Sequence, residues 1–138
     1  IKEGNYFLDW AAIRISEKAN DRFIFDKFVE LSEILIGEPL FLIHHPDGQS
    51  KKVSKIGCKI IEIPIDGKEW EGKTIGYKSA FSHTCDTTFG SSGSPILDKD
   101  GRLVGLHFAG FGVLAELMGK YNRATIAKYV LNEIEKTR

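Results

Sequence analysis

The sequence has little of what marks several common protein classes. It contains two cysteines, one methionine and four prolines in 138 residues, and no apolar run approaches the roughly 20 residues that span a bilayer. Lysine plus arginine equals aspartate plus glutamate, at 19 each, so no overall charge attracts nucleic acid or an anionic membrane. No histidine or cysteine pair has the spacing of a zinc site. We therefore expect no membrane span, no nucleic-acid partner, and no metal or other cofactor.

The two cysteines, Cys58 and Cys85, are too few to form a disulfide framework. They could pair with each other, but isolated thiols fit a reducing compartment better. We therefore expect two free core thiols and a cytoplasmic protein.

The chain has the composition and pattern of one globular β domain, with 42% hydrophobic and 28% charged residues. Asp-Gly turn signals separate short β-branched or aromatic runs, which predicts an antiparallel barrel. The predicted strands are 6–15, 40–44, 53–64, 75–84, 95–97 and 103–108. Residues 22–35 carry a partial helical pattern. Residues 122–136 predict a C-terminal helix with an apolar stripe.

The string Gly-Ser-Ser-Gly-Ser-Pro at residues 90–95 is the most informative motif for chemistry. A serine nucleophile needs a tight turn that exposes its hydroxyl and nearby backbone N–H groups that face the developing oxyanion. Gly90 and Gly93 flank Ser92 and permit such a turn. Taken alone, the string is equally typical of an inert Ser/Gly-rich hairpin loop.

A second segment, residues 5–15, carries one carboxylate, Asp9, in an otherwise apolar run, where it is either a structural acceptor or an orienting acid. Residues 9–15 resemble the strand that carries the triad aspartate of chymotrypsin-clan, trypsin-like peptidases. Residues 90–95 resemble the nucleophile loop of that family, and residues 103–110 resemble the strand beside its specificity pocket. The resemblance implies an all-β, trypsin-like antiparallel barrel with a C-terminal helix.

The resemblance also implies a division of the chain. Residues 1–20 would end a first barrel and carry the triad aspartate. Residues 21–38 would link the two barrels, and residues 39–138 would form the second barrel and the C-terminal helix.

In such a serine endopeptidase, Ser92 would be the nucleophile and Asp9 would orient the catalytic histidine. The N–H groups of Gly90 and Ser92 would form the oxyanion hole. The family's chain order is His, Asp, Ser, but every histidine here follows Asp9. The base would therefore come from an N-terminal part of the same protein outside these residues, and the chain alone would be nearly inactive. The alternative is a catalytically dead module that binds a peptide without cutting it.

The resemblance places the substrate pocket at Asp86, Thr87, His107 and Gly110. Asp86 at the floor would select Lys or Arg before the scissile bond. Thr87 with His107 resembles the pair with which viral main proteases and glutamyl endopeptidases bind Gln or Glu. An apolar preference follows if Asp86 points away. The other histidines, His44, His45 and His83, are expected to be structural.

Residues 67–74 also match the pattern of a phosphate-binding loop, which requires a strand before it and a helix after it. The following residues read as extended chain, and two glutamates would repel phosphate. Coincidence in a Gly/Lys-rich hairpin is the favoured interpretation.

Overall fold

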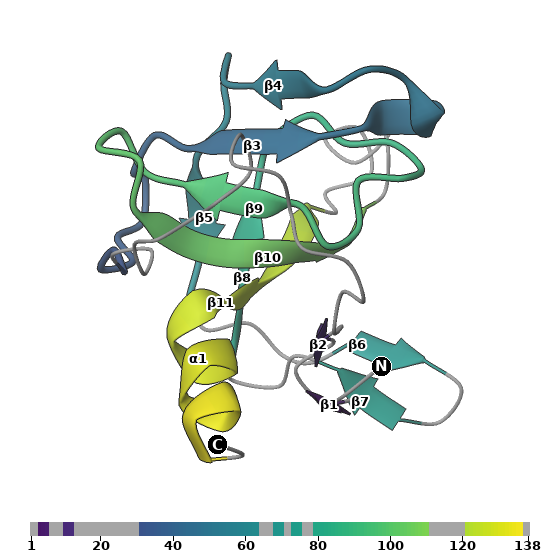
Figure 1. Ribbon diagram of the computed structural model, residues 1–138. Helices are drawn as coiled ribbons and strands as arrows, with labels where there is room; N and C mark the ends of the chain where they lie inside the picture. Colours follow the sequence, from purple (N-terminus) through teal and green to yellow (C-terminus); the bar gives the residue numbers. More distant parts are fainter. Residues whose placement is uncertain are drawn as a thin grey trace, which may run out of the picture.

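A computed structural model describes residues 3–5, 10–12, 31–63, 68–70, 73–75, 79–110 and 121–136 (Figure 1). Its main element is a seven-stranded antiparallel sheet with the strand order β4-β3-β9-β10-β11-β8-β5. The strands are β3 (Phe41–His44), β4 (Lys52–Ser54), β5 (Ile60–Glu62), β8 (Ala80–His83), β9 (Pro95–Leu97), β10 (Leu103–Ala109) and β11 (Asn122–Ile126). A 3-10 turn, η2 (Pro46–Gly48), follows β3, and one helix, α1 (Ala127–Lys136), follows β11.

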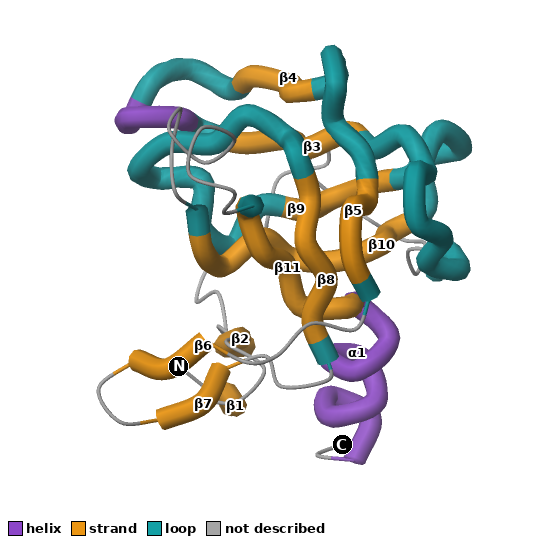
Figure 2. Tube along the Cα trace, turned by 180° about the vertical axis from the view of Figure 1, so that it is seen from behind, coloured by secondary structure: helices purple, strands orange, loops and turns teal. Residues whose placement is uncertain are grey.

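The sheet curls until its two ends approach each other (Figure 2). Backbone hydrogen bonds join β5 to the segment that leads into β3. Gly37 N–H donates to the Ile60 carbonyl at 2.8 Å, and Leu40 N–H donates to the Cys58 carbonyl at 2.9 Å. These bonds close the sheet into a barrel and satisfy an edge that would otherwise be open. The predicted all-β antiparallel barrel with a C-terminal helix is confirmed.

The interior of the barrel is filled by alternate residues of its strands, as the period of two in a β-strand requires. Its members are all less than a tenth exposed: Leu40, Leu42, Cys58, Ile60, Phe81, Cys85, Ile96, Val104, Ala124 and Ile126. Burial of this apolar surface provides the main stabilisation of the fold.

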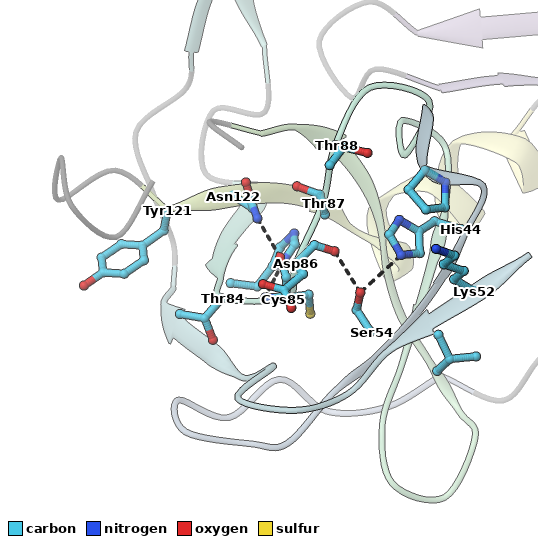
Figure 3. Close-up of a pocket in the computed structure, with 13 residues that line it drawn as sticks. His44, Lys52, Ser54, Thr84, Cys85, Asp86, Thr87, Thr88, Tyr121 and Asn122 are labelled. Carbon is cyan, nitrogen blue, oxygen red and sulfur yellow. Dashed lines mark hydrogen bonds between the residues drawn. The ribbon is translucent and has the colours of Figure 1, made fainter. Parts of the chain in front are cut away.

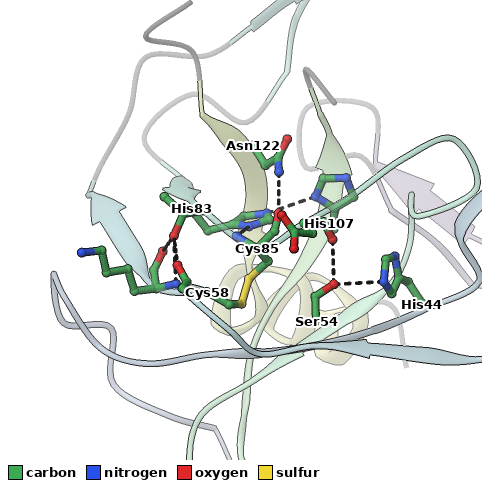
Figure 4. The surroundings of a disulfide bond; sticks show 11 residues. His44, Ser54, Cys58, His83, Cys85, His107 and Asn122 are labelled. Atoms are coloured by element: carbon green, nitrogen blue, oxygen red, sulfur yellow. Dashed lines mark hydrogen bonds between the residues drawn. A yellow bond between two sulfur atoms is a disulfide. The ribbon is translucent and has the colours of Figure 1, made fainter. Parts of the chain in front are cut away.

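Cys58 and Cys85 form a disulfide within this core (Figure 4), so the prediction of two free thiols is wrong. The two residues are 27 positions apart, and the pairing of β5 with β8 brings the entry to β5 beside the end of β8. Cysteine usage therefore no longer supports a reducing compartment.

The C-terminal segment differs from the predicted helix over 122–136. Its first five residues form β11, which pairs with β8 on one side and β10 on the other. The helix begins only at Ala127 and packs against β10 and β11. Pairing with two strands outweighs the helical pattern here, because alternate residues from Asn122 to Ile126 also fit a strand. No described helix has the length and apolar character that a membrane crossing needs.

Four shorter strands form two hairpins: β1 (Glu3–Asn5) pairs with β2 (Trp10–Ala12), and β6 (Lys68–Trp70) pairs with β7 (Lys73–Ile75). In the described residues the strand predicted over 6–15 begins at Trp10, where the chain has turned back on β1. Asp9 lies outside the described residues, as do residues 22–30 of the partial helix. Thr74 lies within β7, so the strand-to-helix context of a phosphate-binding loop is absent from this segment.

Two further predicted strands are interrupted. The run over 53–64 divides into β4 and β5 at a turn around Gly57, whose φ is +67°. The run over 75–84 contains the end of β7 and all of β8. Ile56 lies within the first of these breaks, so the hydrophobic pattern alone could not locate it.

Candidate active site

The Ser92 turn lies between the loop after β8 and the start of β9, and β10 holds it in place. Gly93 N–H donates to the His107 carbonyl at 2.7 Å, and His107 N–H donates to the Ser94 carbonyl at 3.0 Å. Ser91 N–H donates to the Thr88 carbonyl at 3.2 Å, which closes the preceding turn. Ser92 itself is exposed. The turn therefore presents one hydroxyl to solvent while its neighbours are fixed on both sides.

Gly90 is required by its backbone conformation and by its neighbours. Its φ is +86°, and a Cβ atom there would lie only 2.8 Å from the His45 carbonyl oxygen. The η2 turn fixes the backbone next to Gly90, since Asp47 N–H donates to the Phe89 carbonyl at 2.7 Å. Within the part of the chain that the structure describes, the Gly90 and Ser92 N–H groups have no hydrogen-bond partner. They remain the predicted oxyanion donors.

Ser91, directly before the predicted nucleophile, is fully buried and belongs to a chain of hydrogen bonds through His44. Its Oγ lies 2.8 Å from His44 Nδ1 and accepts the Thr88 N–H at 3.2 Å. On the other side of the ring, His44 Nε2 lies 3.1 Å from Ser54 Oγ. The Ser54 hydroxyl donates to the Asp86 carbonyl at 2.9 Å (Figure 3).

These contacts fix the proton positions along the chain. Because Ser54 donates its only proton to the Asp86 carbonyl, its oxygen accepts from His44 Nε2–H. The neutral ring then accepts the Ser91 hydroxyl proton on Nδ1. Burial, with a contribution from Lys52, lowers the pKa of His44 and favours this neutral form. The turn before Ser92 is thus held by hydrogen bonds between neutral groups.

The pocket residues predicted from the sequence are only partly brought together. Burial alternates along the segment after β8, so that Cys85 and Thr87 are buried while Asp86 and Thr88 are exposed. Thr87 and His107 meet beneath Gly110, as a Cβ atom on Gly110 would lie 2.8 Å from Thr87 Oγ1 and 3.6 Å from His107 Nε2. Asp86 does not belong to this group, so the structure does not place its carboxylate at the floor.

Asn122 is a site residue that the sequence analysis missed. Its Oδ1 would lie 3.0 Å from the same Cβ position on Gly110, and its Nδ2 donates to the Cys85 carbonyl at 2.6 Å. The sequence assigned Asn122 to the first turn of a helix. Its place on β11, opposite His83 on β8, is what carries it to the pocket.

His83 and His107 form a buried pair on β8 and β10 (Figure 4). Their facing nitrogens, His83 Nε2 and His107 Nδ1, are 3.1 Å apart. Cys85 N–H donates to His83 Nδ1 at 3.2 Å. Burial, reinforced by His107, lowers the pKa of His83 well below its ordinary value. Burial, with His44 contributing, lowers the pKa of His107 to about 4. Both rings are therefore neutral near pH 7.

A cavity of about 380 Å³ lies between the β3–β4 hairpin and the segment after β8 (Figure 3). The residues that line it include His44, Lys52, Ser54, Asp86, Thr87 and Asn122, but not Ser92 or His107. The cavity thus borders the back of the His44 hydrogen-bond chain and not the exposed face of the Ser92 turn.

The solved structures that resemble this chain share its fold. The active form of the Rv3671c protease from M. tuberculosis superposes with a TM-score of 0.63 at 20% identity, covering 78% of this chain and 46% of that one. The serine endoprotease from Yersinia pestis gives 0.60 at 15% identity, covering 78% and 34%.

Two sequence matches accompany the shared fold. The chain is 28% identical over 142 residues to the serine protease FAM111B of Homo sapiens, covering 80% of this chain and 18% of that protein. It thus spans less than a fifth of this curated relative and about half or less of the solved structures. The family described as trypsin-like peptidase domain matches residues 3–106. Because this match spans most of the sequence, the chain belongs to the trypsin-like peptidase domain family.

Proposed function

We propose that the protein is a serine endopeptidase that hydrolyses peptide bonds in protein or peptide substrates, with Ser92 as the nucleophile. The observation that carries this proposal is the exposed Ser92 on a turn held by Gly90 and by the backbone of His107. An attacking serine needs this exposure, and the N–H groups of Gly90 and Ser92 would receive the oxyanion that develops.

In this proposal Asp9 orients a catalytic histidine that is supplied by polypeptide outside these 138 residues. Each histidine of the chain is engaged elsewhere: His44 with Ser91 and Ser54, His45 with the Gln49 carbonyl, and His83 with His107. None is bonded to Ser92. Residues 1–20 would then end a first barrel, residues 21–38 would link the barrels, and residues 39–138 would form the second barrel.

A second candidate is a peptide-binding module that has lost its base. The hydrogen bonds of the four histidines favour it, because none of them is made to Ser92. Such a module would keep the pocket beneath Gly110 but would not turn substrate over.

Labelling of the complete natural protein with a fluorophosphonate separates the two candidates. The endopeptidase requires covalent labelling at Ser92 that Ser92→Ala abolishes. Ser94→Ala is the matched control, since Ser94 lies in the same turn but is buried, and it should keep the label. A folded protein that takes no label, yet binds peptides, would overturn the endopeptidase and support the binding module.

A further inference from the structure

Residues 48–61 carry a local excess of positive charge. They contain no aspartate or glutamate but have four lysines, namely Lys51, Lys52, Lys55 and Lys59. The whole chain, by contrast, has 19 charged residues of each sign. All four lysines are exposed, and none of them forms an ion pair with any residue that the structure describes. This stretch therefore presents unneutralised charge to solvent.

The same stretch contains an open edge of the sheet. β4 pairs with β3 on one side, and no described strand pairs with its other side (Figure 1). All three residues of β4 line the cavity of about 380 Å³, so open space adjoins the strand. The unpaired N–H and C=O groups of a sheet edge can bond to another extended chain.

The two faces of this edge differ in their side chains. Ser54 lies opposite the buried Leu42 of β3, so Ser54 faces the barrel. Because successive side chains of a strand alternate, Val53 lies on the outer face, where it is 54% exposed. Lys51 and Lys55, two residues away on either side, share this face. Residues 51–55 thus present lysine, valine and lysine along about 17 Å of edge.

The charge of the outer face matches an acidic ligand. A carboxylate opposite Lys51 or Lys55 would form an exposed ion pair, and an apolar side chain between two such carboxylates would contact Val53. Asp86 contacts β4 from the other face, where its carbonyl accepts the Ser54 hydroxyl proton. An acidic segment on the outer face therefore meets lysines directly.

Other occupants fit this edge less well. In a second copy of the chain, antiparallel pairing of two β4 strands about Val53 would set Lys51 opposite Lys55, and like charges directly opposite destabilise a sheet. Residues 48–61 contain no arginine and no aromatic residue, which are the side chains that read or stack on bases. A nucleic acid or a lipid surface would also leave the free backbone groups of the edge unused.

We propose that the outer edge of β4 binds an extended, acidic segment of another protein, which adds to the sheet as a further strand. The segment would carry acidic side chains opposite Lys51 and Lys55 and an apolar side chain opposite Val53. Binding at this edge does not depend on the chemistry at Ser92, because none of these three residues belongs to the nucleophile turn.

Binding of synthetic peptides to the complete natural protein carrying Ser92→Ala tests this site without cleavage of the peptide. Fluorescence anisotropy would compare a labelled peptide with Glu-Thr-Val-Thr-Glu at its centre and the same peptide with Gln in place of both Glu residues. We expect the Glu peptide to bind about fivefold more tightly, the effect of two exposed ion pairs. Equal binding of the two peptides, or binding of neither, would overturn the proposal.

Two N-methylated forms of the Glu peptide test strand addition without any change to the protein. Each form is methylated at alternate residues, in opposite phases. Only every second N–H group of an added strand faces the sheet edge, so one form should lose binding while the other keeps it. Equal binding of both forms would show that charge alone attracts the peptide, and would overturn strand addition.

A double variant, Lys51→Gln with Lys55→Gln, should weaken the Glu peptide about fivefold, to the affinity of the Gln peptide. The matched control is Lys99→Gln with Lys128→Gln, which removes the same charge from two other exposed lysines and should bind like the parent. Equal loss in the two double variants would overturn the proposal. So would tighter binding of single-stranded DNA or phosphatidylserine vesicles that the Lys51 and Lys55 changes abolish.

Discussion

Replacement of His107 by Gln should remove part of the acid sensitivity of the fold. His107 is 3% exposed, and burial, with His44 contributing, lowers its pKa to about 4 from an ordinary value of 6.5. The folded chain therefore binds this proton more weakly than the unfolded chain does. As the pH falls below 6.5 the unfolded state takes up the proton first, so the free energy of unfolding decreases until the pH reaches about 4.

The magnitude follows from the two pKa values. One pKa unit corresponds to about 1.4 kcal/mol, so the full effect of His107 is roughly 3 kcal/mol at pH 4. At pH 5 the unfolded ring is almost fully protonated and the folded ring is mostly neutral, which gives about 2 kcal/mol. A domain with a total stability of about 5–15 kcal/mol would show this loss clearly.

Urea denaturation followed by circular dichroism measures the free energy of unfolding of each protein at pH 7 and at pH 5. The loss between the two pH values is then compared between proteins. The His107→Gln protein should lose about 2 kcal/mol less than the natural protein between the two pH values. Its side-chain oxygen can still accept the His83 proton, and any overall destabilisation cancels in the difference. An equal loss in the natural and His107→Gln proteins would refute the assignment of a buried, neutral His107.

Three further changes test the nucleophile turn and the barrel. Gly90→Ala should displace an oxyanion donor and slow fluorophosphonate labelling about 100-fold. Gly101 also has a positive φ, but the space around it is open, so Gly101→Ala should lower stability without slowing the labelling. Replacing Cys58 and Cys85 by Ser should lower the free energy of unfolding by about 3–4 kcal/mol in urea, since the bond spans 27 residues. Burial alone would raise the pKa of Asp98, but hydrogen bonds from Ser32, Arg102 and Asp100 lower it to about 2. Asp98→Asn should therefore cost about 2 kcal/mol in thermal melts at pH 7, and this difference should shrink as the pH falls from 4 towards 2.

The parts of the site that sequence could predict are those set by local backbone chemistry. The conformation of Gly90 depends on a few neighbouring residues, and a turn with positive φ at Gly90 and Gly93 follows from their identity. The strands at β3, β9 and β10 were predicted almost to their ends because short β-branched runs are bounded by turn residues. The role of Ser92 as nucleophile and the position of Asp9 stay predictions.

The parts that could not be predicted depend on which strands become neighbours. Cys58 and Cys85 pair because β5 lies beside β8, and the residues around each cysteine do not predict which strands become neighbours. Asn122 reaches the pocket because β11 lies between β8 and β10, while its own sequence fits a helix as well as a strand. Asp86 and Thr87 were both assigned to the pocket, but the alternation of burial along this segment leaves Asp86 exposed and buries Thr87.

Ser91 shows how a buried uncharged side chain can support a whole turn. A buried aspartate at this position would need a cation, and the ion pair would depend on a charged group delivered from elsewhere in the molecule. A serine needs only one acceptor and one donor, and His44 Nδ1 and Thr88 N–H supply both from adjacent segments. His44 lies on β3 and is in turn fixed by Ser54, which lies on the paired strand β4. The turn that presents Ser92 is therefore held by uncharged groups that belong to the barrel and its loops, and no ion pair is needed to keep its conformation.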